Sequence, residues 1–362
     1  MSRTAANLPP GALRRATPLP AALLPDGAAG GWRISYHSTG HDHRIRTVTG
    51  MVLIPAADPL RQGWPVLSYA HGTTGLDDAC APSRKGLFPF ERDYLAHWLS
   101  LGYAVTVTDY QGVGGGGRHP YLHGESEAWA VTDAVRAARQ LDLPFGRHWL
   151  VCGFSQGGHA ALNTAAVAPG YAPELDFRGT LALAPPHRFQ DLWARLTADP
   201  DAPLSPLLLL ILEGLESVHR GFDSDIHLTP RGRALTRVAD EATYYALLRD
   251  AIVHSPAEVL ARDLNDDVEF QSMLAGLDAP VGRFPQPVLI AHGLADTIAD
   301  PAASARLASD LSAAGTDATW EGFPGTDHTG VLAASLPTTA RWIDRVFGVH
   351  DDTPAVLAAR GR

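Results

Sequence analysis

Short, continuous apolar segments recur along the chain, and each is bounded by turn residues or ends at a polar residue. Such segments are typical of strands that are buried on both faces, as in parallel sheets. Two earlier segments, over residues 33–36 and 46–54, are rich in β-branched residues and predict antiparallel strands joined near Gly40. The continuous segments cover residues 65–70, 103–108, 149–152, 179–184, 287–291 and 318–323.

Segments with apolar residues at helical spacing lie between these strands. The clearest covers residues 125–141. Another begins at Asp300-Pro301, an N-cap followed by a proline at the first helical position. The alternation of strand and helix predicts an α/β protein with a mostly parallel sheet flanked by helices. The remaining helical segments cover residues 91–101, 157–168 and 336–347.

Residues 186–282 interrupt this alternation, since they contain no convincing strand. They contain repeated helix starts, such as Thr229-Pro230 and the capping box Ser255-Pro-Ala-Glu258. We therefore expect a helical cap inserted into the core. The predicted organisation is an extended arm (residues 1–31), a core (residues 32–185 and 283–350), the cap (residues 186–282) and a tail (residues 351–362).

Composition excludes several functions. The 362 residues are 45% hydrophobic and 19% charged, with a formal net charge of −10 and no Lys/Arg cluster, so nucleic acid is not an expected partner. The two cysteines are too few for a disulfide framework, and zinc-ligand spacing is absent. Cofactors and metals are therefore not expected. The oligomeric state is left open.

The apolar stretches are too short for membrane insertion. The stretch over residues 19–24 is broken by prolines and matches a signal peptide poorly. The longest apolar run, residues 207–212, is far below the roughly 20 residues that span a bilayer. We expect a soluble protein without a transmembrane segment; a cytoplasmic location is favoured and secretion is the alternative. The apolar face around this run is expected to pack on the core; lining the pocket and docking to a membrane or a partner are the alternatives.

The sharpest chemical signal is Gly153-Phe154-Ser155-Gln156-Gly157, which matches G-x-S-x-G. A predicted strand ends just before it and a small-residue helix begins within it. The serine must occupy a turn too tight for flanking side chains, so glycines are needed there. We therefore predict that Ser155 is a nucleophile at the positive end of a helix.

A serine nucleophile needs a base, and the base needs an orienting carboxylate. Asp296 follows the predicted strand over residues 287–291, and His328 lies on a glycine-rich loop after the last one. We predict Ser155, Asp296 and His328 as a catalytic triad. The rivals look structural or solvated: Asp300 as an N-cap, Asp327 beside the base, and His159 and His292 in a helix and a turn.

Acyl transfer also needs donors for the developing oxyanion. One should be the backbone N–H of Gln156, and the other that of Thr73, with Thr74 as the alternative, in the small-residue loop after residues 65–70. The glycine-rich run over residues 112–117 lacks a phosphate-loop ending. We expect a mobile loop near the site mouth. His119, Tyr121 and His123 follow it and are expected in a surface loop, with substrate contact as the alternative.

With these residues identified, the chain resembles the secretory lipase family of α/β-hydrolases over residues 35–347. Five segments carry this resemblance. They are the elbow, Tyr69-Ala-His-Gly-Thr73, Asp109-Tyr-Gln-Gly-Val-Gly114, His292-Gly-Leu-Ala-Asp296 and Asp327-His328. It implies an α/β-hydrolase fold that hydrolyses hydrophobic acyl esters beneath a helical cap, without a cofactor. It assigns the same triad.

The expected function is therefore that of a serine carboxylic ester hydrolase acting on a small-molecule ester. An acyltransferase or cyclising thioesterase would use the same triad, and no residue separates these activities. A non-catalytic binding protein on a hydrolase scaffold is the third hypothesis, which an intact triad disfavours.

Overall fold

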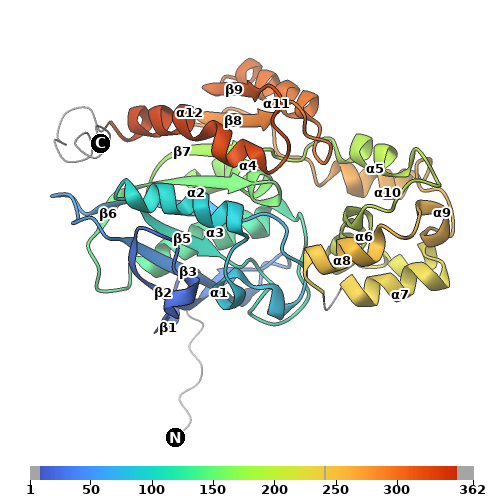
Figure 1. Ribbon diagram of the computed structural model, residues 1–362, viewed down its shortest axis with the longest axis horizontal. Coiled ribbons are helices and arrows are strands. Elements are labelled where there is room, and N and C mark those ends of the chain that lie inside the picture. Colours follow the sequence, from blue (N-terminus) through green and yellow to red (C-terminus); the bar gives the residue numbers. More distant parts are fainter. Residues whose placement is uncertain (1–8, 240–241, 349–362) are drawn as a thin grey trace, which may run out of the picture.

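The computed structural model describes residues 9–239 and 242–348. In this part of the chain, nine strands form one sheet in the order β1-β2-β3-β5-β4-β6-β7-β8-β9 (Figure 1). The strands β1 to β3 are antiparallel to their neighbours, whereas β4 to β9 pair in parallel. The predicted α/β class with a mostly parallel sheet is confirmed. The strands are β1 (Leu13–Pro18), β2 (Ala28–Thr39), β3 (Ile45–Pro55), β4 (Trp64–Ala70), β5 (Ala104–Thr108), β6 (Phe145–Phe154), β7 (Asp176–Leu183), β8 (Val288–Gly293) and β9 (Ala318–Phe323).

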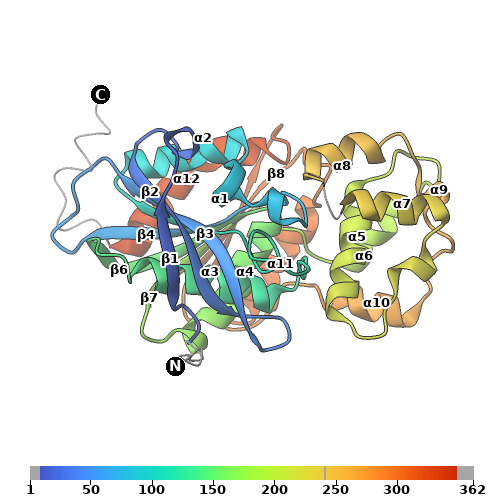
Figure 2. The ribbon, with the colours of Figure 1, turned by 90° about the horizontal axis from the view of Figure 1, so that it is seen from below.

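Helices cover both faces of the sheet (Figure 2). One face packs against α2 (Pro89–Ser100) and α12 (Gly330–Phe347), and the other against α3 (Gly124–Ala138), α4 (Gln156–Tyr171) and α11 (Pro301–Ala313). A short helix, α1 (Pro82–Lys85), lies in the loop after β4.

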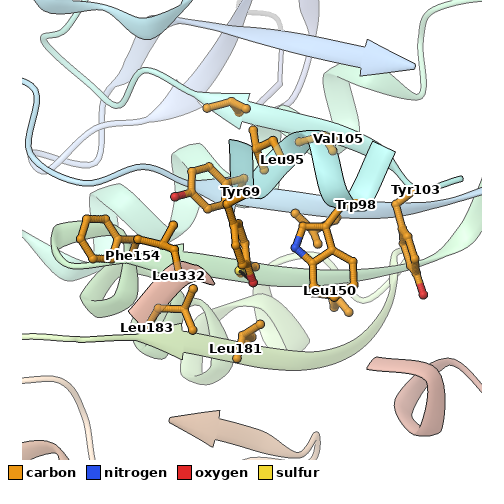
Figure 3. Packing of buried hydrophobic residues seen from close by; sticks show 14 of the residues in the cluster. Tyr69, Leu95, Trp98, Tyr103, Val105, Leu150, Phe154, Leu181, Leu183 and Leu332 are labelled. Atoms are coloured by element: carbon orange, nitrogen blue, oxygen red, sulfur yellow. Dashed lines mark hydrogen bonds between the residues drawn. The ribbon is translucent and has the colours of Figure 1, made fainter. Parts of the chain in front are cut away.

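The core beneath α2 and α12 holds the central strands together (Figure 3). Trp98 of α2 packs there with Tyr69 of β4, Leu150 of β6 and Leu181 of β7, and each of these side chains is fully buried. Burial of one such side chain contributes about 1.5–3 kcal/mol. This packing fixes the strands from whose carboxyl ends the candidate site is built.

The segment between β7 and β8 forms a helical lobe beside the sheet (Figure 1). The apolar residues of α6 are buried in a hydrophobic cluster composed mostly of lobe residues. The predicted capping box is present, since Ser255 N donates to Glu258 Oε2 at 3.0 Å. The lobe helices are α5 (Phe189–Thr197), α6 (Pro206–Val218), α7 (Pro230–Ala239), α8 (Tyr244–Ala251), α9 (Pro256–Val259) and α10 (Val268–Ala275).

The lobe contacts the core through main-chain and charged groups. Tyr244 N donates to Thr74 O at 2.9 Å, and Gly75 forms an isolated bridge with Thr243. Arg118 pairs with Glu213 and Glu216 of α6 at 2.6 and 3.0 Å. Both kinds of contact join the lobe to loops that surround the candidate site.

The N-terminal segment differs from the expected extended arm. Residues 13–18 of the expected arm form β1, which pairs with β2 at the edge of the sheet. At the other end, α12 begins at Gly330, six residues before the predicted start, and contains Pro337. The expected tail, residues 351–362, lies outside the described residues. In the described part of the chain, no helix is long and apolar enough to cross a membrane.

Candidate active site

Ser155 lies in the turn between β6 and α4, in a strained backbone conformation with φ 54° and ψ −118°. The glycines on either side have no room for a side chain. A Cβ at Gly153 would lie 1.9 Å from Gly157 O, and one at Gly157 would lie 1.8 Å from Ala70 O. The G-x-S-x-G spacing is thus required by backbone packing, and the tight turn presents the serine hydroxyl at the end of the strand.

His328 reaches Ser155 from the loop between β9 and α12. Its Nε2 lies 2.9 Å from Ser155 Oγ, and its Nδ1 lies 2.6 Å from Asp296 Oδ2. Because the carboxylate only accepts, the proton of His328 lies on Nδ1 and Nε2 is free to accept from the serine. The ring of Phe154 lies beside the imidazole, with centroids 4.9 Å apart.

Asp296 follows β8 in a turn that satisfies its carboxylate. Its Oδ1 accepts from the backbone N–H groups of Ile298 and Ala299, at 2.7 and 3.0 Å. Burial alone would raise the pKa of Asp296, but hydrogen bonds from His292 and His328 outweigh this effect and hold the pKa far below its usual value. Asp296 is therefore ionised throughout the neutral range.

His292 is a second histidine on the same carboxylate oxygen. Its Nε2 lies 2.9 Å from Asp296 Oδ2, and its Nδ1 lies 2.8 Å from Ser304 Oγ. The sequence indicated a histidine with a structural role in a turn. The structure places it at the end of β8, fully buried, where it shares the Asp296 Oδ2 atom with His328.

The two expected oxyanion donors lie on neighbouring segments. Gln156 is the first residue of α4, and Thr73 lies in the loop after β4. The close packing of Gly157 on the Ala70 and His71 carbonyls brings these segments together. In the described part of the chain, neither the Gln156 nor the Thr73 backbone N–H donates a hydrogen bond.

Buried polar residues hold the side chains of both segments. Gln156 Nε2 donates to Glu127 Oε1 at 2.7 Å and to His119 Nε2 at 3.0 Å. The hydroxyls of Thr73 and Tyr121 lie 2.8 Å apart. The expectation that His119 and Tyr121 lie on the surface is wrong, because both are buried and contact the candidate site. Glu127 was missed altogether, since nothing in the sequence marks a buried carboxylate within a helix.

The rival acids and histidine have other partners. Asp300 Oδ1 caps α11 by accepting from Ala302 N at 2.9 Å, and Asp327 Oδ1 accepts from Gly330 N at 2.7 Å. His159 Nε2 donates to Leu277 O at 2.7 Å. Within residues 9–239 and 242–348, no group of three or more His, Cys, Asp or Glu side chains could hold a metal ion.

Comparison with known proteins identifies the family. The secretory lipase family model matches residues 88–353. The chain belongs to the secretory lipase family. The family resemblance predicted from the motifs is confirmed, and the family supports ester hydrolysis as the class of activity.

Solved structures and sequence relatives were both found. Lipase A from Candida antarctica, in its closed state, superimposes with a TM-score of 0.79 at 19% identity, over 95% of this chain and 84% of that one. The predicted α/β-hydrolase fold is thereby confirmed. Lipase A from Moesziomyces aphidis is 24% identical over 91% of this chain and 74% of its own. A protein of Mycobacterium tuberculosis named probable inactive lipase MT1628 is 25% identical over 87% of this chain and 73% of its own.

Proposed function

We propose that the protein is a serine carboxylic ester hydrolase. The observation that carries this proposal is the continuous chain of hydrogen-bonding groups from Ser155 through His328 to Asp296, with contacts of 2.9 and 2.6 Å. In this proposal Ser155 is the nucleophile, His328 the general base and Asp296 the group that orients and stabilises the imidazolium. The oxyanion donors are the backbone N–H groups of Thr73 and Gln156.

The reaction proceeds through an acyl-enzyme. Ser155 Oγ attacks the ester carbonyl carbon while its proton passes to His328 Nε2, and the carbonyl electrons move to the oxygen. The tetrahedral intermediate collapses, the bond to the alcohol oxygen breaks, and His328 returns the proton to that oxygen. Water then attacks the acyl carbon while His328 takes its proton. The bond from that carbon to Ser155 Oγ breaks, His328 returns the proton to Oγ, and the acid is released. Each oxyanion donor is expected to contribute about 10²–10³-fold to kcat.

A row of aromatic rings supports a hydrophobic acyl group as the substrate. Starting from His328, it runs through Phe154, Phe90 and Phe88 to Tyr245 of the lobe, with successive centroids 4.9, 5.8, 5.6 and 4.8 Å apart. This row of rings begins at the base, where Phe154 is buried, and ends at the exposed Tyr245 of the lobe. It offers an acyl chain a continuous nonpolar contact next to the reacting carbon.

Two alternatives follow from the same scaffold. Acyl transfer or cyclisation would replace water by another nucleophile at the same acyl-enzyme. The name of the mycobacterial relative supports a non-catalytic scaffold, but the hydrogen-bonded triad of this chain favours catalysis.

The cytoplasmic location stays a prediction, and the description of the family as secretory supports export instead.

The test is hydrolysis of p-nitrophenyl esters from acetate to palmitate by the wild type and three variants. Ser155→Ala should abolish turnover, and Asp296→Asn should lower kcat by on the order of 10⁴. Asp300→Asn is the matched control and should leave kcat unchanged, because asparagine is an equally good N-cap. If the wild type is inert on every ester but a fluorophosphonate labels Ser155, acyl transfer replaces hydrolysis as the better hypothesis. Failure of both turnover and labelling would refute a catalytic role.

A further inference from the structure

Buried hydrogen bonds fix two successive peptide groups of the loop that carries the oxyanion donor Thr73. The peptide between His71 and Gly72 is held at both ends. Its carbonyl accepts from Tyr110 OH at 2.9 Å, and its N–H donates to Glu91 Oε1 at 2.9 Å. This peptide group therefore cannot rotate without breaking a buried hydrogen bond.

The next peptide, between Gly72 and Thr73, is held only at its carbonyl. Gly72 O accepts from His71 Nδ1 at 2.6 Å. In a trans peptide the N–H points away from the carbonyl, so the fixed carbonyl also fixes the direction of Thr73 N–H. That N–H has no partner in the described part of the chain, which leaves it available to a substrate.

The carboxyl group of Glu91 anchors this arrangement. It lies in the first turn of α2 and is fully buried. Its Oε1 accepts from Gly72 N and from Tyr69 OH, the latter at 3.0 Å. Its Oε2 makes no hydrogen bond of ordinary geometry in the described part of the chain, but the backbone N–H of Phe88, the N-cap of α2, interacts with the carboxyl group and lowers its pKa.

Such a carboxyl group is costly to bury. Burial raises the pKa of Glu91 to about 7, although its hydrogen bonds lower it. An apolar side chain of similar size would avoid this cost. A buried carboxyl group at this position therefore calls for an explanation beyond packing.

We propose that Glu91 is a positioning residue that holds the Gly72 N–H and thereby preorganises Thr73 N–H as the oxyanion donor. This inference rests on the proposed ester hydrolysis and adds a residue to it. Glu91 touches neither the substrate nor the reacting atoms. It acts only through the backbone of the loop.

The test compares substitutions that keep or remove the acceptor for Gly72 N–H. Glu91→Leu keeps most of the side-chain volume and removes the acceptor, so kcat should fall about 10–100-fold, with KM within about threefold of the wild-type value. Affinity for an alkyl trifluoromethyl ketone, which forms a tetrahedral adduct on Ser155, should fall in parallel. Glu91→Gln retains an acceptor oxygen, so its kcat and its affinity for the ketone should both lie within about threefold of the wild-type values. Asp93→Leu, an acidic residue on the exposed side of the same helix, is the matched control and should change neither quantity.

Several outcomes would overturn the inference. Equal kcat and ketone affinity in the wild type and Glu91→Leu would do so, as would a change confined to KM. If Glu91→Gln folds but loses as much kcat and ketone affinity as Glu91→Leu, the acceptor is not the relevant feature. If Glu91→Leu does not fold, Glu91→Met, which is flexible enough to fill the same space, takes its place. A wild type that neither hydrolyses esters nor binds the ketone would refute the proposed function itself, which is a separate result.

Discussion

Replacing Gly157 by alanine tests whether backbone contact at the nucleophile turn sets the geometry of the site. The added Cβ would lie 1.8 Å from Ala70 O and 2.8 Å from His71 O, whereas real Cβ contacts essentially never fall below 3.0 Å. Both neighbours are main-chain atoms of the β4 strand and the loop after it, so no side chain can rotate away.

The start of α4 must therefore move by about 1.2 Å or more relative to β4. That movement carries the Gln156 N–H away from Thr73 and shifts Ser155 relative to His328. A misplacement of about 1 Å can cost on the order of 10²-fold in rate. Overpacking of this kind also destabilises the fold by about 1–3 kcal/mol. We expect Gly157→Ala to lower kcat/KM for the best p-nitrophenyl ester at least 100-fold.

Gly170 of the same helix provides the matched control. It is exposed, and a Cβ there would meet nothing within 4 Å. Gly170→Ala should keep full activity and stabilise the helix by up to about 1 kcal/mol. Tm from circular dichroism and steady-state kinetics separate the two effects. Gly157→Ala with activity within threefold of the wild type would refute the argument from backbone packing.

Two further predictions concern buried titratable groups. His292→Leu removes one hydrogen-bond donor from Asp296. It should destabilise the protein by about 1.5–3 kcal/mol in urea unfolding and lower kcat about tenfold. Unchanged stability of this variant would show that the contact contributes nothing. The pKa of Glu91 is raised to about 7 by burial, so wild-type stability should fall, by up to about 1.4 kcal/mol per pH unit, as pH rises from 4.5 to 7. Glu91 interacts electrostatically with the phenols of Tyr69, Tyr110 and Tyr245, whose pKa values are raised, so these phenols stay neutral in that range. Glu91→Gln should lack this slope, and identical pH profiles of Tm for the two proteins would contradict the prediction.

The sequence predicted the features that depend on local pattern. Apolar segments located the inner strands, and glycine spacing around Ser155 indicated a turn whose tightness the Gly153 and Gly157 contacts now explain. Asp296 and His328 could be selected as triad residues because each lies in a loop that follows a parallel strand. The carboxyl ends of parallel strands lie at one edge of the sheet, where Ser155 also lies. These inferences needed only chain order and the direction of parallel strands.

The missed features depend on tertiary contacts. Strand β1 is short, carries two arginines and ends in a proline, and its pairing depends on the edge that β2 offers. Glu91 and Glu127 resemble solvated helix residues in sequence, and only the packing of their helices buries them. His292 gains its role from Asp296 four residues later, a spacing that carries no such meaning outside this turn.

The main-chain contact between the lobe and the loop after β4 affects how far the sequence of the lobe can diverge among relatives. A hydrogen bond from Tyr244 N to Thr74 O does not depend on which side chains occupy those positions, so ordinary substitutions leave it intact. Proline at position 244 would remove it, although proline is otherwise favoured at the start of a helix. Gly75 is the other constrained position, because a Cβ there would lie 2.7 Å from Ala242 O. The lobe can therefore change most of its sequence, and with it the shape offered to a substrate, while it stays attached at the same place.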